Sequence, residues 1–248
     1  MSRTQPAPIL RCVSVRKSFA SPGGTVEVLR DLALTVQPGE MVAILGDSGA
    51  GKTTLLHLVG GIDRPDAGRI EFRGVDVAAG AAAERARYRN RELGFIFQFH
   101  NLLPEFSAIE NAMMPLLIRG EDRSRARARA ATVLRELGLG DCLDRRPTAL
   151  SGGEQQRVAI ARAVAGGPSM LLADEPTGNL DERNAEAVFS LLLDLHRRRG
   201  MTTLLVTHSE RLAQRCTRVL RMEHGSLTAW MGAHYNVAAG SSLVPAEE

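Results

Sequence analysis

Cysteine is scarce in this chain of 248 residues. Only three cysteines occur, Cys12, Cys142 and Cys216, and they lie far apart in the sequence. An odd number of cysteines without metal-ligand spacing argues against a disulfide framework and against a zinc site. We therefore expect three buried thiols in a protein of a reducing compartment, the cytosol.

Long hydrophobic runs are also missing. No apolar stretch approaches the roughly 18 residues that a membrane-spanning helix requires, so we expect that the chain does not cross a membrane by itself. Residues 1–6, Met-Ser-Arg-Thr-Gln-Pro, lack the apolar segment of a secretory signal, and we expect none at this end.

A large excess of charge of one sign is absent as well. Lysine and arginine together number 31 against 28 aspartates and glutamates, which gives a net charge of +3. Acidic residues are spread along the whole chain, so the composition lacks the basic footprint of a nucleic-acid-binding protein, and we expect no nucleic-acid partner. The length suits one α/β domain, or one domain with a subdomain.

The most informative segment begins with five apolar residues, Met41–Leu45, which are typical of a strand buried on both faces. The next residues match the pattern G-x-x-x-x-G-K-[ST], and apolar residues at helical spacing follow in 55–59. Strand, loop and helix are the context that a P-loop (Walker A motif) requires. Its residues are Gly46, Asp47, Ser48, Gly49, Ala50, Gly51, Lys52 and Thr53, followed by Thr54.

The residue types of this loop suit the binding of a nucleotide's phosphates. Glycines permit positive φ, which turns successive backbone N–H groups toward an anion. The following helix adds unpaired N–H donors and the positive end of its dipole. Lys52 reaches the β- and γ-phosphates, and the Thr53 hydroxyl is a ligand for Mg²⁺. Asp47 is an unusual choice, because it adds negative charge near the phosphates unless its side chain points outward.

The segments before the P-loop predict an antiparallel layer. Residues 9–16, 26–29 and 32–36 have the alternation of strands, with turn residues at 21–24 and 37–39 between them. Phe19 lies in the first connection. Taken alone it is more typical of a core aromatic, although an aromatic side chain near a nucleotide stacks well on adenine.

After the P-loop helix the chain predicts a strand at 69–72, a polar helix at 81–93 and a short strand at 94–98 that ends in Gln98. Helices at 109–118 and 123–137 follow, and we interpret about 99–165 as an inserted helical subdomain. Arginines alternate along the second helix at 123, 125, 127 and 129. They spread around the helix, which favours a solvated surface over a patch for lipid headgroups or a partner.

A long helix begins near Ser151. Ser151 and Glu154 have the spacing of a capping box, an ordinary helix start. Gly152 and Gly153 in the first turn are poor helix formers, however, and close approach of the backbone to a phosphate would explain both.

Charged and polar residues follow two further buried strands. Asp174 and Glu175 end the strand 170–173, and His208 follows the strand 202–207. Carboxylates at such a place are costly unless they are used. Asp174 suits Mg²⁺ and Glu175 suits polarisation of an attacking water. His208 shares the predicted sheet edge with Gly46, so we interpret it as a γ-phosphate contact. An amphipathic helix at 184–199 separates the two strands, and 219–222 with 226–229 form a hairpin.

The order of these motifs resembles the ATP-binding cassette (ABC) ATPases over about residues 9–230. The resemblance assigns Leu150–Gln155 to the family signature, Gln98 to the Q-loop, 174–175 to Walker B, 179–181 to the D-loop, His208 to the switch histidine and Phe19 to the adenine-stacking aromatic. It implies a P-loop NTPase core with a mostly parallel sheet flanked by helices, an antiparallel β subdomain and the inserted helical subdomain, with 1–230 as one domain and 231–248 as a flexible tail.

The same resemblance implies roles for individual residues. The catalytic residues are Lys52, Gln98, Glu175 and His208. ATP contacts come from Phe19, from the P-loop residues 46–54, and from Ser151, Gly152, Gly153, Gln155 and Asp181. Magnesium contacts come from Thr53, Gln98 and Asp174. The family also implies a head-to-tail homodimer that sandwiches ATP.

One segment is informative about the subgroup. Phe97–Asn111 and Met114–Ile118 are similar to the ATPase subunit of bacterial lipoprotein-releasing transporters. This implies membrane permease subunits that dock near Phe99–Ile118, and a location at the cytoplasmic face of the inner membrane. Ala173–Asp181 is shared with macrolide-exporter and cell-division ABC ATPases, so these remain alternatives. A soluble ABC ATPase is a further alternative, although no coiled-coil insertion or second cassette is present.

Overall fold

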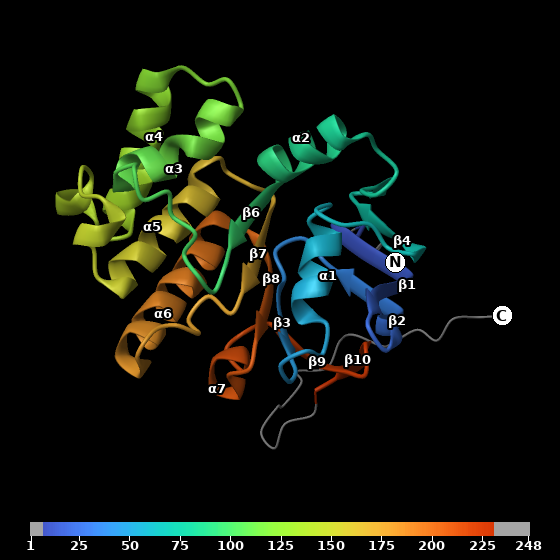
Figure 1. The fold of residues 1–248 in the computed structure, drawn as a ribbon. Coiled ribbons are helices and arrows are strands. Elements are labelled where there is room, and N and C mark those ends of the chain that lie inside the picture. The colour runs from blue at the N-terminus through green and yellow to red at the C-terminus, as the bar shows by residue number, and fades with distance from the viewer. Residues whose placement is uncertain (1–6, 231–248) are drawn as a thin grey trace, which may run out of the picture.

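The computed structural model describes residues 7–230, which form two sheets and seven α-helices (Figure 1). The larger sheet has the strand order β10-β9-β3-β8-β7-β6, and the smaller one has the order β2-β1-β4-β5. The strands of the larger sheet are β3 (Met41–Leu45), β6 (Leu93–Ile96), β7 (Met170–Asp174), β8 (Thr202–Thr207), β9 (Arg218–Glu223) and β10 (Ser226–Ala229). Those of the smaller sheet are β1 (Leu10–Ser21), β2 (Gly24–Val36), β4 (Ala67–Phe72) and β5 (Val75–Asp76). The expectations for 1–6 and 231–248 lie outside the described residues.

The larger sheet is parallel except at β10, and both of its faces are buried. In β3, Met41, Ala43 and Leu45 belong to one apolar cluster, which contains side chains of the helices α3 to α6. Val42 and Ile44 point to the other face, where a second cluster joins α1 and the smaller sheet. All five residues of β3 are therefore apolar because alternate side chains enter different cores.

The site is positioned by three neighbouring strands, β3, β8 and β7. They are parallel and in register, with Leu45 opposite Thr207 and Asp174 opposite Val206. Their carboxyl ends meet at one edge of the sheet, which is where ligands collect in open α/β sheets. The P-loop, the pair Asp174–Glu175 and His208 consequently emerge side by side.

Six of the helices occur close to the predicted bounds, whereas the short helix α7 was not predicted. The helices are α1 (Lys52–Val59), α2 (Ala82–Glu92), α3 (Ala108–Ile118), α4 (Arg123–Glu136), α5 (Gly152–Ala165), α6 (Glu182–Arg199) and α7 (Glu210–Ala213). In Figure 1, α1 lies between the two sheets, and α3 and α4 pack with α5 on the opposite side of the larger sheet. The four alternating arginines of α4 are exposed, as expected for a solvated surface.

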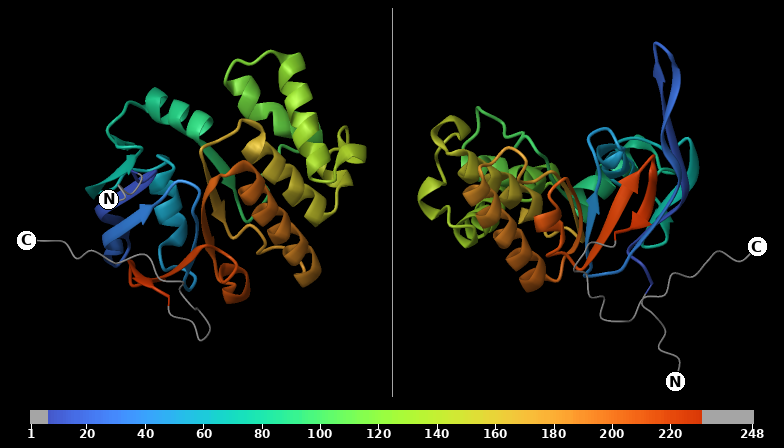
Figure 2. Two further views of the ribbon diagram at one scale, coloured as in Figure 1. Left: turned by 180° about the vertical axis from the view of Figure 1, so that it is seen from behind. Right: turned by 90° about the horizontal axis from the view of Figure 1, so that it is seen from below.

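The antiparallel layer differs from the prediction in the lengths of its strands. The first strand was expected at 9–16, but β1 continues to Ser21, so Phe19 lies within a strand and not in a connection. Two strands were expected at 26–29 and 32–36, but β2 is a single strand of 13 residues. The polar residues between them do not end the strand, because a β-bulge accommodates them. Val15 pairs with Leu32 and Lys17 with Leu29, so Arg30 and Asp31 lie opposite Arg16 alone. Asp31 takes a left-handed conformation there, with φ 43°, and forms an exposed ion pair of 2.7 Å with Arg16. The pairing of β1 and β2 shifts in register along its length, and the long hairpin projects from the body (Figure 2).

The three cysteines are buried and free, which confirms the expectation of buried thiols. Burial raises the pKa of Cys12 and of Cys216 to about 12, so neither forms a thiolate at neutral pH. Among residues 7–230, no helix combines the length and hydrophobicity that crossing a bilayer requires.

Candidate functional site

The P-loop folds as an anion cradle at the start of α1. Gly51 precedes the helix with φ 104°, and a Cβ there would lie 2.9 Å from a Leu29 methyl group, so only glycine fits. No side chain caps the helix, which leaves its first N–H groups available to a ligand. The ammonium of Lys52 donates to the carbonyl oxygens of Gly46, at 2.7 Å, and Asp47, at 3.0 Å. The lysine is thus held inside the curve of the loop.

Asp47 is exposed, and it is not among the residues that line the cavity in front of the P-loop. Its backbone carbonyl accepts a hydrogen bond from Lys52. Its carboxylate therefore does not contribute to the lining of that cavity.

Thr53 and Asp174 bring Walker A and Walker B together. The Thr53 hydroxyl donates to Asp174 Oδ2 over 2.8 Å. Burial raises the pKa of Asp174, and the charge of the adjacent Glu175 raises it as well, while the bond from Thr53 opposes both. A hydroxyl and a carboxylate in contact are the oxygen donors that Mg²⁺ prefers, so the residues present fit this cation.

Glu175 and His208 are in direct contact. The Nδ1 atom of His208 lies 3.0 Å from Glu175 Oε2, and the His208 backbone N–H donates to the same oxygen. Glu175 has a left-handed backbone, with φ 45°, which is uncommon outside glycine. Its own N–H is bound by Val206 of β8, so the strained residue is fixed in place.

Gln98 reaches the same cavity from the segment after β6. Its side chain contacts Asn179, whose amide donates to the Gln98 carbonyl over 2.8 Å. This pair joins the Q-loop to the D-loop. The sequence analysis placed Asn179 in the D-loop but gave it no role of its own. Nothing in the local sequence indicated that its side chain would contact Gln98.

Phe19 lies at the site and not in the core. It is 44% exposed, and it lines the P-loop cavity together with Val28 of β2. The Lys17 ammonium lies 5.2 Å from the centre of its ring. Taken alone, Phe19 was more typical of a core aromatic, and that expectation is wrong because the projecting hairpin carries the residue away from the apolar cluster. The resemblance assigned Phe19 to the nucleotide site, and its side chain lines that cavity. Val28 was missed, since nothing in strand alternation distinguishes a side chain that faces a ligand.

The cavity in front of the P-loop has a volume of about 460 Å³. It gathers Phe19, Gln98, Asp174, Glu175, His208 and the P-loop residues Ser48, Gly49, Gly51, Lys52, Thr53 and Thr54. The residues to which the resemblance assigns adenine stacking, phosphate binding and polarisation of water therefore line one cavity.

The signature residues form a second, separate cluster. Ser151 caps α5 and accepts from the Glu154 N–H, while Glu154 accepts from Ser151. Gly153 packs so closely on Asn184 that a Cβ would lie 3.1 Å from its side-chain oxygen. Asp181 caps α6 and accepts from the Asn184 N–H over 3.0 Å. The start of α5 and the D-loop end of α6 are thus neighbours, but no residue of 151–155 lines the P-loop cavity.

Gln155 has a structural role within this cluster. Its side-chain amide donates to the carbonyl oxygens of Pro147 and Leu150, over 3.1 and 3.0 Å. These bonds hold the loop that leads into the signature helix. The side-chain nitrogen of Gln155 is therefore engaged in hydrogen bonds within the chain. Ser151 and Gly152, by contrast, are exposed to solvent.

Residues 29–178 match the family model described as "ABC transporter", and this range contains the P-loop, the Q-loop, the signature and Walker B. The chain belongs to the ABC transporter family. Its assignment rests on more than half of the sequence and agrees with the order of the motifs. As a member of this family, the chain is an ATP-binding ATPase.

Three relatives of this ABC ATPase align with it over most of both chains. It is 49% identical over 214 residues to the lipoprotein-releasing system ATP-binding protein LolD of Syntrophus aciditrophicus, covering 86% of this chain and 96% of the relative. It is 50% identical over 220 residues to LolD of Novosphingobium aromaticivorans, covering 89% and 98%. LolD of Geobacter metallireducens is 49% identical over 221 residues, again with coverage of 89% and 98%.

Solved structures of ABC cassettes share the fold of this ATPase. A dimeric structure of MJ0796, a bacterial ABC transporter cassette, has a TM-score of 0.82 and 33% identity, covering 90% of this chain and 99% of the other. A dimeric post-hydrolysis structure of MJ0796, bound to ADP and Pi, has the same TM-score with 32% identity and the same coverage. The predicted fold class is confirmed.

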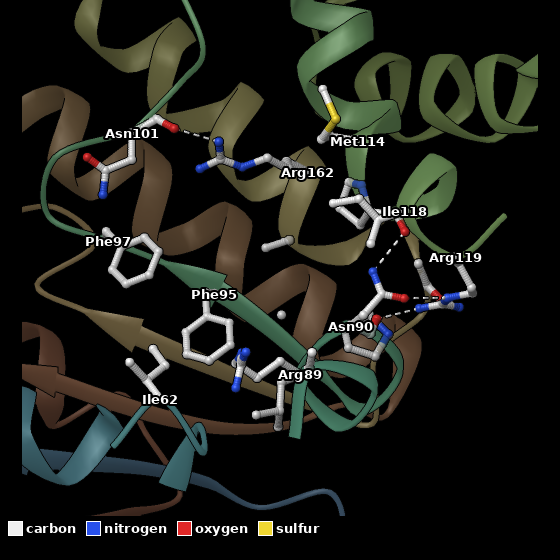
Figure 3. A pocket seen from close by; sticks show the side chains of 17 residues that line it. Ile62, Arg89, Asn90, Phe95, Phe97, Asn101, Met114, Ile118, Arg119 and Arg162 are labelled. Carbon is white, nitrogen blue, oxygen red and sulfur yellow. Dashed lines mark hydrogen bonds between the residues drawn. The ribbon is translucent and has the colours of Figure 1, made fainter. Parts of the chain in front are cut away.

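A second hollow of this ABC ATPase lies away from the P-loop. It is an apolar groove of about 460 Å³ between α2, β6, α3 and α5 (Figure 3). Phe95 and Phe97 stack in it with ring centres 5.7 Å apart. Ile118, which is 70% exposed, lies at its edge on α3. Close to the groove, Phe99 is 68% exposed, so apolar surface is concentrated along the predicted docking segment.

Proposed function

We propose that this chain is the ATP-hydrolysing subunit of a bacterial transporter that releases lipoproteins from the inner membrane toward the outer membrane, and that it works as a head-to-tail pair. The observation that carries the proposal is the division of the site. The P-loop cavity holds the groups that bind and hydrolyse ATP, while Ser151, Gly153 and Asp181 form a cluster elsewhere on the same chain.

In a head-to-tail pair each nucleotide lies between the two clusters. Lys52 of one chain occupies the near side of the γ-phosphate, and Ser151 with Gly153 of the second chain binds its far side. ADP lacks the γ-phosphate that both chains contact. ATP therefore holds the two chains together, and its hydrolysis lets them separate. A ligand shifts such an equilibrium only by its differential affinity for the two states, and a near-complete switch needs about 5.5 kcal/mol. Both MJ0796 structures are dimeric, which supports pairing of two chains.

Hydrolysis requires the protein mainly to position and polarise. Glu175 accepts hydrogen bonding from the attacking water and increases its nucleophilicity, and His208 holds Glu175 and contacts the γ-phosphate. Lys52 neutralises charge that develops on the phosphates, and Phe19 stacks on adenine. Thr53, Asp174 and Gln98 would hold Mg²⁺, which supplies further charge neutralisation when it is bound.

Membrane subunits would bind the helical unit, about residues 99–165. The exposed apolar side chains Phe99 and Ile118 and the groove beside them support docking near Phe99–Ile118. The chain would then lie at the cytoplasmic face of the inner membrane, held there by its permease partners. Movement of the helical unit on closure of the pair would transmit work to those partners.

Lipoproteins are the proposed cargo because the three relatives above are lipoprotein-releasing ATPases at about 50% identity. Depletion of this chain in its own bacterium should leave lipoproteins in the inner membrane, measured by fractionation and immunoblotting. Increased macrolide susceptibility, or filamentous cells, with normal lipoprotein sorting would instead support the exporter or cell-division alternatives and overturn the proposal.

A further inference from the structure

The apolar groove carries positive charge that is not neutralised within it. Arg89, Arg119 and Arg162 line it, and none of its lining residues in the described part of the chain is an aspartate or a glutamate. Three guanidinium groups beside stacked aromatic rings, without a carboxylate, create a positive potential in a weakly hydrated hollow.

The positive charge of Arg162 has no negatively charged partner among its hydrogen-bond acceptors. Arg162 donates to the carbonyl oxygens of Asn101, over 2.6 Å, and His100, over 2.9 Å. Both acceptors are neutral, and burial lowers the pKa of Arg162 because the charge is poorly solvated. A half-buried cation of this kind is stabilised when an anion approaches.

The three arginines differ in the donors that they retain. Arg119 uses all three of its nitrogens, on the Asn90 side chain, the Asn90 carbonyl and the Gly166 carbonyl. Arg89 makes one hydrogen bond that the structure shows, to the Gly61 carbonyl over 2.8 Å. A guanidinium has five N–H donors, so Arg89 keeps most of them for a ligand. In Figure 3, Arg89 lies toward one end of the groove and Arg162 toward the other.

We propose that the segment of the membrane partner that occupies this groove is apolar and carries an acidic side chain, which pairs with Arg89. The inference rests on the proposed function and adds the chemistry of the partner to it. Apolar side chains of the segment cover Phe95 and Phe97, and the carboxylate takes the free donors of Arg89, in a geometry that Arg forms bidentately with carboxylates. Arg162 adds positive potential farther along the groove and orients the segment.

The occupant is tested by crosslinking in the intact complex. The chain, with the photoreactive residue p-benzoylphenylalanine at position 118, is co-expressed with the membrane subunits encoded in its own genome, and the crosslinked peptide is identified by mass spectrometry. We expect a cytoplasmic segment of an integral membrane protein with an Asp or Glu among apolar residues. A segment without an acidic residue, or crosslinks to lipid alone, would overturn the inference and leave the proposed function standing. Absence of any membrane-protein crosslink would overturn the proposed function as well.

Charge reversal tests the pairing itself. Arg89→Glu should reduce the amount of complex recovered from detergent-solubilised membranes by about 10-fold or more, because a charge pair is replaced by repulsion. Arg87→Glu is the matched control, since Arg87 is exposed on the same helix and does not line the groove. Replacing the partner's acidic residue with arginine should restore the Arg89→Glu complex, and this rescue also shows that the variant folds. Equal recovery with Arg89→Glu and Arg87→Glu, or failure of the reciprocal exchange, would contradict the pairing.

Discussion

His208 and Glu175 meet at the ends of two neighbouring strands, with His208 Nδ1 3.0 Å from Glu175 Oε2. The Glu175 side chain is mostly buried, whereas the His208 side chain is largely exposed. This difference fits the two roles that we propose. The buried carboxylate would polarise water at a defined point, and the exposed imidazole would contact the γ-phosphate.

Glu175→Gln should retain ATP binding and lose turnover by about 10²- to 10⁴-fold, because the amide cannot accept a proton from the attacking water. The unhydrolysed nucleotide should then hold two chains together, and light scattering after gel filtration with Mg-ATP would detect the pair. Glu182→Gln, at the exposed start of α6, is the control and should behave as wild type. Hydrolysis by Glu175→Gln at the wild-type rate would refute the role of the carboxylate.

Asp174→Asn should make the free protein more stable and less active. The raised pKa of Asp174 means that folding favours its protonated form, so the contribution of this residue to stability is full below the ordinary aspartate pKa, about 3.9, and is lost as pH rises through the higher folded value. At neutral pH the ionised side chain is destabilising. The amide removes that charge and still accepts from Thr53.

Calorimetry across pH tests this prediction. The Tm advantage of Asp174→Asn should grow from pH 4 to pH 7, with about 2–4 °C for each kcal/mol gained. The Mg²⁺-dependent ATPase activity of Asp174→Asn should be lower than that of wild type throughout this pH range. A Tm advantage that is constant with pH would show that ionisation of Asp174 is not the cause.

Ser151→Ala and Ser107→Ala form a matched pair, because each serine caps a helix in a capping box with a glutamate three residues later. Each variant should lose about 0.5–2 kcal/mol of stability. Only Ser151→Ala should also lose ATPase activity, by about 10- to 100-fold, since a hydrogen bond to a charged phosphate is worth about 1.5–3 kcal/mol. Nucleotide binding by the single chain should persist in both.

The bulkier substitution Ser151→Arg should abolish ATPase activity and leave nucleotide binding by the single chain intact. Equal loss of activity in the two alanine variants would mean that the signature serves folding alone. Titration with a fluorescent ATP analogue and steady-state ATPase assays separate the two outcomes.

Phe19→Ala should weaken ATP binding by about 10- to 100-fold, because aromatic stacking on a base is worth roughly 1–3 kcal/mol. Phe19→Trp should preserve binding. Phe99→Ala is the control, since Phe99 is exposed but does not line the P-loop cavity. ATP affinities are measured by isothermal titration calorimetry. Equal affinities for all three variants would show that Phe19 does not contribute to ATP binding.

Long periodic segments and contiguous motifs could be predicted from the sequence. Buried strands such as β3 and β8 have apolar runs of the right length, and the P-loop pattern has a fixed spacing between Gly46 and Lys52. The common edge of β3, β7 and β8 followed from the rule for parallel strands. These features depend on local sequence, so no knowledge of distant contacts was needed.

Features that depend on distant contacts could not be predicted. The β2 strand continues through Asp31 because its pairing with β1 forms a bulge opposite Arg16. The strand pattern alone did not place Phe19 at the site, where the projecting hairpin carries it, and only the family resemblance assigned it there. Gln98 meets Asn179 across 81 residues of sequence. The groove lined by Arg89 and Arg162 joins two helices whose separate patterns contain no sign of each other.

The left-handed backbone of Glu175 has a consequence for the engineering of this protein. A residue held in this conformation, here with φ 45°, costs of order 1–3 kcal/mol, and glycine would relieve most of it. A selection for heat resistance that ignored turnover would therefore tend to replace the side chain to which we assign the polarisation of water. Thermal stability and ATP consumption thus pull in opposite directions at this one position.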